Sequence, residues 1–483
     1  MKKTAAIIGG GVIGGGWAAR FLLNGWDVNI FDPDPEAARK IGEVLANARR
    51  SLPSLYDTAL PDEGELQFHE SIEAAVADAS WIQESVPERL DIKHTTFKEI
   101  QQHAAVDAII GSSTSGFKPS ELQTGALRAE QIIVAHPFNP VYLLPLIELV
   151  PSSSTPVDTI TAASEVLTTL GLKPLVVRKE IDAHIADRML EAVWREGLWL
   201  IKDGICTTEE LDDAIRYGFG LRWAQMGLFE TYRIAGGEAG MKHFIEQFGP
   251  ALQWPWTKLM DVPEFNDELV ELIASQSDAQ SGHMTIRELE RLRDDNLVGI
   301  MRALKQSGSG AGGTIKQHEA SLSEVSASSE GLPITGQRQI PQSWTDYNGH
   351  MNEAYYLEIA SIATDRFMKL VGCTDEYVAA GQSYFTVENH VCYLSELHQG
   401  DQLTVSTQLL NGEGKKMHLF HRLHGPDMTV AATVESLLLH MDLEARKTCL
   451  PGEAVAAQLA RISAQHSSLP MPEGAGRYVG QRD

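Results

Sequence analysis

The 483-residue sequence contains few cysteines and has no excess of basic side chains. Its four cysteines lie far apart and form no CxxC pair, so their spacing suggests neither a metal site nor a disulfide framework and fits a reducing cytoplasm. Lysines and arginines number 40 against 65 aspartates and glutamates, which gives a formal net charge of −25. Nucleic acids and anionic membranes are bound by concentrated basic faces. We therefore expect small-molecule substrates, and neither nucleic acid nor membrane as a partner.

The N-terminus lacks the uninterrupted apolar run of a secretory signal peptide. Two lysines follow Met1, but the glycines between residues 9 and 16 would break such a run. We expect this end of the protein to be uncleaved. A length of 483 residues, with 43% hydrophobic side chains, predicts about three domains.

Residues 5–32, AAIIGGGVIGGGWAARFLLNGWDVNIFD, have the pattern of a nucleotide-binding βαβ unit. A short apolar strand precedes a GxGxxG sequence, and a helix and a second strand follow it. The first glycine permits a tight turn, the second lets the backbone approach a pyrophosphate, and the third brings helix and strand together. The phosphates are expected at the positive end of the helix. The residues expected to contact the cofactor there are Gly9, Gly11, Val12, Ile13 and Gly14.

Asp32 follows the second strand directly and is expected to accept hydrogen bonds from the ribose hydroxyls. Its charge would repel a 2′-phosphate, and no arginine occurs after it until Arg39. The sequence therefore favours NAD over NADP as the cofactor.

The pattern of the chain changes three times, and we expect an α/β protein with a Rossmann doubly wound sheet, then an all-helical domain, then a C-terminal α+β domain. Composition marks a flexible Gly/Ser/Ala-rich linker before the last domain. That domain should begin with a strand near residues 337–342 and a long helix over 352–371, followed by strands around 384–394, 402–410, 416–424 and 428–441. The expected segments are 1–180 for NAD binding, 181–305 helical, 306–334 linker, 335–466 α+β and 467–483 a polar tail.

The first 300 residues carry several further motifs, which are ESVPERLDIK (84–93), SSTSG (112–116), HPFNP (136–140), IE (147–148), HIADR (184–188) and QMGLFE (225–230). Together they resemble the 3-hydroxyacyl-CoA dehydrogenase family. The resemblance implies that His136 is the general base and Glu148 its partner. An imidazole, with an ordinary pKa of about 6.5, is suited to accept the hydroxyl proton when a hydride leaves the carbinol carbon. Glu148 would fix the imidazole tautomer and stabilise the imidazolium.

The same resemblance implies roles for four other residues. Ser115 corresponds to a serine that hydrogen-bonds the substrate oxygen, and Asn139 to an asparagine beside the base. Glu88 and Lys93 correspond to residues near the nicotinamide.

A carboxylate and several aromatic residues suggest a cationic substrate. Asp187 stands where the family has an asparagine, and an extra carboxylate suits a cation. Aromatic faces hold quaternary ammonium groups, and Phe138 adjoins the base. Within the family, this half most resembles enzymes that oxidise the C3 hydroxyl of L-carnitine with NAD. Five tryptophans of the helical region are further candidates, with Trp223 as the expected contact, and these are Trp194, Trp199, Trp223, Trp254 and Trp256.

Residues 344–370, WTDYNGHMNEAYYLEIASIATDRFMKL, resemble hotdog-fold thioesterases of the 4-hydroxybenzoyl-CoA thioesterase type. The resemblance implies that Asp346 is the catalytic carboxylate, acting as nucleophile or as base for water. Backbone N–H groups near residues 349–352 would polarise the thioester carbonyl, since a helix N-terminus suits an oxyanion.

Other residues of this segment have less defined roles. His350 and Asn352 are candidates for substrate contact or for shaping the loop. Glu353 and Glu358 on the helix are reserve candidates for the catalytic carboxylate. Such domains build their site at a subunit boundary, so a homodimer is expected.

Both resemblances together predict a bifunctional enzyme that oxidises L-carnitine and hydrolyses an acyl-CoA thioester, betainyl-CoA, to glycine betaine and CoA. A trimethylammonium substrate at one site makes a trimethylammonium acyl group reasonable at the other. Two alternatives remain open. The dehydrogenase could act on a 3-hydroxyacyl-CoA or on a sugar acid such as gulonate, and the hotdog domain could be a non-catalytic dimerisation module.

Overall fold

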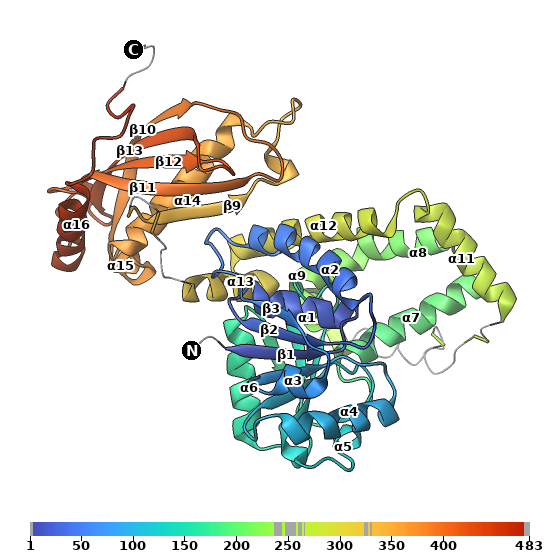
Figure 1. The fold of residues 1–483 in the computed structure, drawn as a ribbon. Coiled ribbons are helices and arrows are strands. Elements are labelled where there is room, and N and C mark those ends of the chain that lie inside the picture. The colour runs from blue at the N-terminus through green and yellow to red at the C-terminus, as the bar shows by residue number, and fades with distance from the viewer. Residues whose placement is uncertain are drawn as a thin grey trace. The chain divides into compact units, whose positions relative to one another are not determined.

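The structure is a computed structural model that describes residues 3–235, 244–246, 257–258, 263–264, 266–322, 327–328 and 331–477. The chain folds into two units (Figure 1). The first unit comprises residues 1–51 and 62–318, and the second comprises residues 52–61 and 319–483. Among the described helices, none has both the length and the apolar character that crossing a bilayer requires.

The described part of the first unit contains an eight-stranded sheet in the order β3-β2-β1-β4-β5-β6-β7-β8. Neighbouring strands are parallel except for β6 and β7, which are antiparallel. After β3, at one edge of the sheet, the chain crosses to β4 on the other side of β1. This reversal of the strand order gives the doubly wound arrangement that the sequence predicts. The strands are β1 (Thr4–Ile8), β2 (Asp27–Phe31), β3 (Leu66–Phe68), β4 (Trp81–Glu84), β5 (Ile109–Ser112), β6 (Ile132–Pro137), β7 (Leu146–Val150) and β8 (Lys173–Val176).

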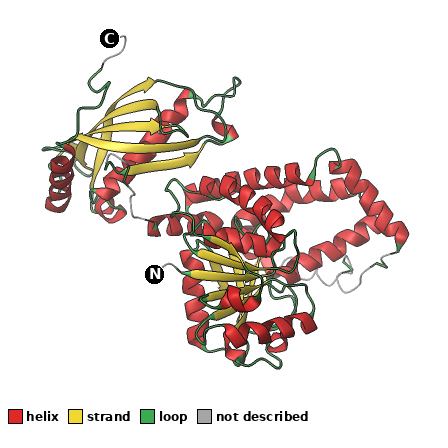
Figure 2. Ribbon diagram, viewed as in Figure 1, coloured by secondary structure: helices red, strands yellow, loops and turns green. Residues whose placement is uncertain are grey.

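Helices pack around this sheet (Figure 2). The central strands are apolar and buried because both of their faces are covered. Trp17 on the first helix is fully buried, and its ring lies 5.9 Å from that of Phe21 and 6.3 Å from that of Trp81. The helices are α1 (Val12–Leu22), α2 (Ala37–Ser51), α3 (Ile72–Val76), α4 (Leu90–His103), α5 (Pro119–Leu122) and α6 (Val157–Thr169).

The described remainder of the first unit is helical, as predicted. Its longest helix begins with a capping box, in which Thr285 and Glu288 exchange side-chain and backbone hydrogen bonds, and it ends at Gly308 with φ +66°. Tyr142 connects the sheet part to this helix by donating a 2.9 Å hydrogen bond to buried Asp294. The helices are α7 (Ala186–Lys202), α8 (Thr208–Ala214), α9 (Gly220–Ala235), α11 (Asp267–Ser281), α12 (Ile286–Ser307) and α13 (Gly310–Ser321).

Helix α13 corrects one expectation, because it lies inside the segment 306–334 that composition marks as a flexible linker. Gly312, Ile315 and His318 are buried, and the His318 Nε2 atom lies 3.1 Å from the carbonyl oxygen of Thr169. The small residues that suggest flexibility serve close packing here: a Cβ on Gly312 would stand 2.0 Å from the backbone carbon of Leu304.

The second unit has an antiparallel sheet wrapped on a helix, as predicted. Its described strands follow the order β10-β13-β12-β11-β9, with β14 paired to β13. Ile359, Ala363 and Phe367 on helix α14 are fully buried toward the sheet. The elements are β9 (Ile334–Gln339), α14 (Glu353–Leu370), α15 (Asp375–Ala379), β10 (Gln382–Tyr393), β11 (Gln402–Asn411), β12 (Lys416–His424), β13 (Val430–Asp442), β14 (Lys447–Thr448) and α16 (Glu453–His466).

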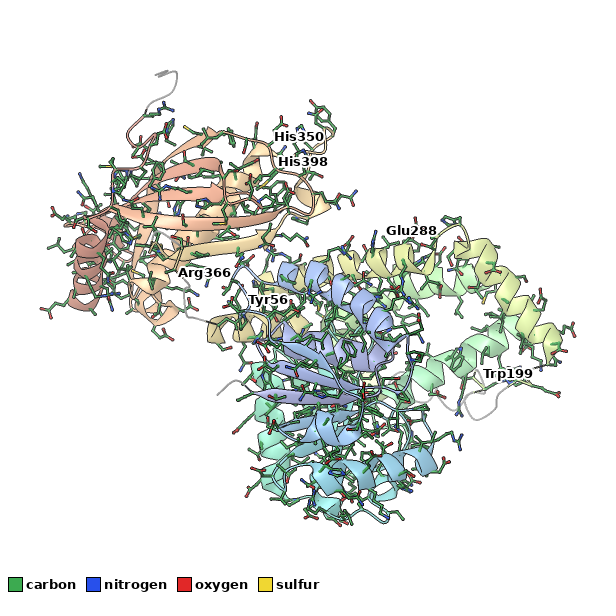
Figure 3. The ribbon with its side chains drawn as sticks, viewed as in Figure 1. Tyr56, Trp199, Glu288, His350, Arg366 and His398 are labelled. Atoms are coloured by element: carbon green, nitrogen blue, oxygen red, sulfur yellow. The ribbon has the colours of Figure 1, made fainter. Side chains whose placement is uncertain are left out.

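The second unit also includes a segment from between α2 and β3. Tyr56 is fully buried there, and the carbonyl oxygen of Asp57 accepts a 3.3 Å hydrogen bond from Arg366 on α14 (Figure 3). Burial lowers the pKa of Arg366, which nearby acidic groups oppose. Residues 52–61, with the short 3-10 helix η1 (Pro53–Leu55), are therefore part of this core rather than a surface loop of the first unit.

Candidate functional sites

The glycine-rich turn between β1 and α1 has the shape that a dinucleotide requires. Gly9 has φ +103°, and a Cβ there would lie 2.5 Å from the carbonyl oxygen of Ser85. A Cβ on Gly14 would lie 1.9 Å from the carbonyl oxygen of Gly9, so helix and strand approach as closely as the motif predicts. Gly11, in contrast, has open space within 4 Å of its Cβ position. That space lies at the N-terminus of α1, where a pyrophosphate fits.

A cavity of about 420 Å³ lies beside this turn. Gly11, Val12 and Asn139 contribute to its lining, so the structure brings the glycine motif and the HPFNP segment to one place. Val12 is 60% exposed, as a residue at the mouth of a binding site is expected to be, and Ile13 beside it is half-buried.

Asp32 lies at the carboxyl end of β2, next to the glycine turn. One carboxylate oxygen accepts a 2.5 Å hydrogen bond from the Gly10 amide, and the other accepts one of 2.7 Å from the Asp34 amide. These bonds hold the carboxylate where the sequence predicts the ribose to bind.

The basic side chains that follow Asp32 are neutralised by acidic neighbours. Arg39 forms ion pairs of 2.8 Å with Glu36 and 2.7 Å with Glu43, and Lys40 forms one of 2.6 Å with Asp34. Neither is left as an isolated cation for a 2′-phosphate, which agrees with the preference for NAD.

The ESVPERLDIK segment contains a buried ion pair that the sequence motifs do not single out. Lys93 Nζ lies 2.8 Å from Glu84 Oε1 and 3.2 Å from Glu88 Oε2, and both Lys93 and Glu84 are buried. Ser112 donates a 2.5 Å hydrogen bond to the other oxygen of Glu84. Burial raises the pKa of Glu84, which Lys93 and the hydrogen bonds oppose. The only sequence signal for Glu84 is a carboxylate at the end of a buried strand.

The SSTSG segment follows β5. Glu88 also accepts a hydrogen bond from the hydroxyl of Thr114. Ser115 lies beside Thr114 and is exposed, so its hydroxyl is accessible to a ligand.

His136 and Glu148 are direct cross-strand partners in the antiparallel pair β6 and β7. His136 Nδ1 lies 3.1 Å from Glu148 Oε2. A carboxylate can only accept, so Nδ1 carries the proton and Nε2 has the free lone pair of a base. The other oxygen, Glu148 Oε1, accepts hydrogen bonds of 2.9 Å from the Ile185 amide and 3.0 Å from the Ala186 amide at the start of α7. Burial raises the pKa of Glu148, but the hydrogen bonds from His136 and the two amides outweigh it and lower the pKa overall.

Asp187 is placed close to the free nitrogen of His136. Its Oδ2 atom lies 3.8 Å from His136 Nε2. Burial and the charge of Glu148 raise the pKa of Asp187, whereas His136 lowers it, and the net direction is upward. The ring of Phe138 meets that of His136 edge-on at 4.8 Å. The substrate side of His136 is thus bordered by a carboxylate and an aromatic ring.

His184, from the HIADR motif, is a second residue that the sequence patterns do not select. It is fully buried, has φ +50°, and its ring lies 5.5 Å from that of His136. Its Nε2 atom lies 3.2 Å from the carbonyl oxygen of Thr114 and therefore carries the proton. Burial lowers the pKa of His184. Within the described residues its Nδ1 atom has no hydrogen-bond partner.

The tryptophans of the helical region are not brought to His136 by any ring contact among the described residues. The ring of Trp223 packs on Phe219 at 4.6 Å. Trp199 faces the ammonium groups of Lys202 at 4.7 Å and Lys258 at 4.2 Å (Figure 3). Trp194 is 60% exposed. The remaining two candidates, Trp254 and Trp256, lie outside the described residues.

In the second unit, Asp346 closes the turn that precedes α14. Its Oδ1 atom accepts hydrogen bonds of 2.8 Å from the Asn348 amide and 3.3 Å from the His350 amide. Gly349, with φ +80°, completes the turn by donating to the Asp346 carbonyl. Oδ2 of Asp346 accepts no hydrogen bond within the described part of the chain. One oxygen is therefore structural and the other is available for chemistry.

The backbone amides of residues 349–352 differ from the expected oxyanion donors. Those of Gly349 and His350 donate to Asp346, that of Met351 donates to the Leu397 carbonyl, and that of Asn352 donates to the Trp344 carbonyl. The tight turn and its cross-strand pairing use these amides internally. The first amide of α14 itself, that of Glu353, has no partner among the described residues, because the first turn of a helix leaves its amides unpaired.

The remaining candidates of this segment are placed around the same helix start. The Asn352 side chain caps α14 by accepting a 3.0 Å hydrogen bond from the Ala354 amide, so it shapes the loop. His350 packs edge-on against His398 at 5.0 Å. Glu353 and Glu358 are exposed on α14.

Comparisons with known proteins match all three parts of the chain. Residues 4–181 match the 3-hydroxyacyl-CoA dehydrogenase NAD binding domain, and residues 184–266 match the C-terminal domain of that family. Residues 340–459 match the thioesterase-like superfamily. These matches confirm the predicted fold class, the dehydrogenase and thioesterase classes, and NAD as the cofactor.

Individual relatives extend the similarity to the full length. A protein of Ruegeria pomeroyi named L-carnitine dehydrogenase/betainyl-CoA thioesterase is 64% identical, with 99% of each chain covered. An L-carnitine dehydrogenase of Mesorhizobium japonicum is 61% identical over 67% of this chain and 91% of its own. Among solved structures, an NAD⁺-dependent 5-formyl-3-hydroxy-2-methylpyridine 4-carboxylic acid 5-dehydrogenase covers 63% of this chain and 99% of its own, with 27% identity and a TM-score of 0.54.

The L-carnitine dehydrogenase of Mesorhizobium japonicum matches about two thirds of this chain. The protein of Ruegeria pomeroyi also covers the thioesterase-like part. The motifs around His136 and Asp346 therefore both lie within the region shared with the two-activity relative. The chain belongs to the L-carnitine dehydrogenase/betainyl-CoA thioesterase family.

Proposed function

We propose that the first unit oxidises the C3 hydroxyl of L-carnitine and that the second hydrolyses betainyl-CoA to glycine betaine and CoA. The observation that carries the first assignment is the His136–Glu148 pair, whose free imidazole nitrogen lies beside the Asp187 carboxylate. Identity over the full length to a relative with both activities supports the pairing.

In the oxidation, His136 Nε2 accepts the proton of the substrate hydroxyl. NAD, when bound, takes the hydride from C3, which leaves the ketone 3-dehydrocarnitine, NADH and one proton. Glu148 keeps the Nδ1 proton in place, so Nε2 is the basic atom, and its negative charge stabilises the imidazolium that forms. Ser115 and Asn139 remain candidates for holding the substrate oxygen, and Glu88 and Lys93 for the nicotinamide side.

The position of Asp187 suits the geometry of carnitine. The quaternary nitrogen is two bonds from the carbinol carbon, so a hydroxyl at His136 Nε2 brings the cation close to the same atom. Asp187 Oδ2 lies 3.8 Å from that nitrogen, and Phe138 offers an aromatic ring nearby. A carboxylate and an aromatic ring together attract a trimethylammonium group.

In the hydrolysis, Asp346 acts through its free oxygen, as nucleophile or as base for water. The Glu353 amide at the start of α14 is the candidate donor to the thioester oxygen. His350 is a candidate contact for the substrate beside the same turn. Water supplies a hydroxyl to the acyl carbon, and CoA leaves as the thiol.

We further propose a homodimer. Strand β10 is the edge of its sheet and pairs only with β13 within the described residues. Phe385 is 49% exposed and Val387 52% exposed on this 12-residue strand, which is the kind of edge that another chain can extend. Leu190 and Phe229 are exposed on helices of the first unit and offer a second contact surface.

A cytoplasmic location is supported by the four cysteines, which are all free.

Glu148→Gln tests the base pair. A neutral amide cannot stabilise the imidazolium. Its NH2 group would also replace one accepting oxygen, so this donor would face either the donor of His136 or those of the two backbone amides. We expect kcat for L-carnitine to fall about 100- to 10,000-fold, with the KM for NAD and thioesterase activity unchanged. Steady-state kinetics of both reactions measure this. Glu191→Gln on α7 is the matched control, and a Glu148→Gln enzyme with normal kcat would contradict the assignment.

Asp187→Asn tests the cationic substrate. Loss of a charge-assisted contact should raise the KM for L-carnitine about 10- to 100-fold. Because the pKa of Asp187 is raised, its charge is lost at a higher pH than for an ordinary aspartate. The wild-type KM should therefore increase as the pH falls through that pKa, and the KM of the variant should not. NADH formation is measured with L-carnitine, D-carnitine, 3-hydroxybutyryl-CoA and gulonate.

Asp182→Asn is the control for this experiment, since Asp182 is exposed and pairs with Lys118. Selective turnover of L-carnitine by the wild type supports the proposal. Faster turnover of 3-hydroxybutyryl-CoA or gulonate would contradict the assignment of carnitine as the substrate.

Asp346→Asn separates catalysis from loop structure. The amide oxygen of asparagine can still accept from the Asn348 and His350 amides, so the turn is retained. We expect betainyl-CoA hydrolysis to decrease at least about 100-fold, with L-carnitine oxidation unchanged as the internal control. Thiol release is the measurement. Full hydrolysis by the variant would refute the role of Asp346, whereas no hydrolysis by the wild type would leave the second unit as a module for assembly.

The mass of the full chain in solution tests the dimer. We expect light scattering after size exclusion to give twice the 53.0 kDa of one chain. Phe385→Lys should reduce thioesterase activity more than dehydrogenase activity, because it charges the edge of the second unit. Phe68→Lys, at an exposed position of the first unit, is the control. A particle of single-chain mass would refute the proposal.

A further inference from the structure

Three potential metal ligands gather on the surface of the second unit beside the turn that contains Asp346. They are His350, Glu396 and His398, and each offers a nitrogen or oxygen within 4.8 Å of the others. Figure 3 shows His350 and His398 next to one another. His350 and Glu396 are 46 residues apart in the sequence, and Glu396 and His398 are two apart, a spacing that matches no metal-binding motif. Only the fold brings the three residues together.

The backbone holds these residues in place. His350 and His398 are directly paired in an antiparallel bridge, and the Met351 amide donates a 2.7 Å hydrogen bond to the Leu397 carbonyl. Paired residues of this kind have Cβ atoms about 5 Å apart on the same face. Leu397 is buried, so its neighbours Glu396 and His398 both point outward.

The three side chains are close enough to share an ion, and no hydrogen bond joins them. His350 Nε2 lies 3.5 Å from Glu396 Oε2, and neither imidazole ring has a hydrogen bond within the described residues. Two ligands about 2.0–2.1 Å from a tetrahedral ion are themselves about 3.3 Å apart. The separation of His350 and Glu396 is close to this value, and His398, whose ligand atom lies within 4.8 Å of theirs, would complete the set by side-chain rotation.

We propose that His350, Glu396 and His398 bind one divalent cation of the Zn²⁺ class. Two imidazoles and one carboxylate suit Zn²⁺, Co²⁺ or Ni²⁺, whereas Mg²⁺ and Ca²⁺ prefer oxygen ligands alone. Water would complete a four-coordinate shell. Asp401 supports His398, since its Oδ2 atom accepts a 2.8 Å hydrogen bond from the His398 amide and lies 3.7 Å from His398 Nδ1.

Occupation of this site slows thioester hydrolysis. The Asp346 amide donates a 2.9 Å hydrogen bond to the His350 carbonyl, and the Asp346 carboxylate accepts from the His350 amide. A cation on His350 therefore fixes the turn that holds Asp346 and withdraws the imidazole from substrate. This consequence rests on the proposed thioesterase role of Asp346, whereas the binding itself does not.

The test of binding uses the full chain without a histidine tag. Titration with Co²⁺ should produce the visible ligand-field absorption of a tetrahedral site, saturating at one equivalent per chain, and Zn²⁺ should displace it. We expect His398→Ala to abolish this absorption and Glu396→Gln to weaken Co²⁺ binding at least about 10-fold. Both residues are largely exposed, so the variants should fold. His283→Ala, at an exposed histidine of the first unit, should bind Co²⁺ as the wild type does.

No ligand-field absorption, or equal absorption from His398→Ala, would overturn the site. In a second arm, micromolar Zn²⁺ should inhibit betainyl-CoA hydrolysis by the wild type but not by His398→Ala, and should leave L-carnitine oxidation unchanged in both. Inhibition that persists in His398→Ala would refute the coupling to hydrolysis. If the second unit hydrolyses no thioester, the Co²⁺ spectra still decide whether the cation binds.

Discussion

The proposed dehydrogenase site depends on one carboxylate, that of Glu148. One of its oxygens accepts from His136 on the neighbouring strand, and the other accepts from the Ile185 and Ala186 amides that open α7. The same side chain therefore sets the tautomer of the base and attaches the helical region to the sheet. Asp187 follows Ala186 in α7. The hydrogen bonds that orient the proposed base therefore also place the Asp187 carboxylate, the proposed substrate contact, beside it. In the proposed site, the geometry of the base and the position of the Asp187 carboxylate are in this way consequences of one buried interaction.

Local patterns in the sequence predict the elements well, and tertiary contacts account for what they leave out. The strand at residues 4–8 and the helix that follows Asn352 depend on short-range periodicity and capping, and both lie where predicted. Helix α13 contradicts its composition, because small residues suit both a linker and a closely packed helix. Glu84 and Lys93 both belong to the ESVPERLDIK motif, but their buried contact and the hydrogen bond from Ser112 follow only from the fold.

The sites show the same distinction. His136 and Glu148 can be identified from motifs, but their role as direct cross-strand partners follows only from the antiparallel turn between β6 and β7. Asp346 illustrates why capping and catalysis are difficult to separate by sequence. One of its oxygens closes the turn and the other accepts no hydrogen bond within the described residues, so a structural role does not exclude the proposed catalytic one. The amides of residues 349–352 cannot serve as oxyanion donors for the same reason, since the turn and the cross-strand pairing already use them.

In the proposed site, the half-buried position of Asp187 accounts for selection of a cation. Without a cation, its charge is poorly solvated and lies near Glu148, which is why its pKa is raised. A trimethylammonium group would offset both effects, whereas a neutral acyl chain would offset neither and would leave a half-buried charge without a partner. On this proposal, discrimination against neutral substrates begins in the free enzyme, before any contact to carnitine forms. An asparagine at this position would remove that penalty, so the proposal makes residue 187 the position that separates cationic from neutral substrates of similar shape.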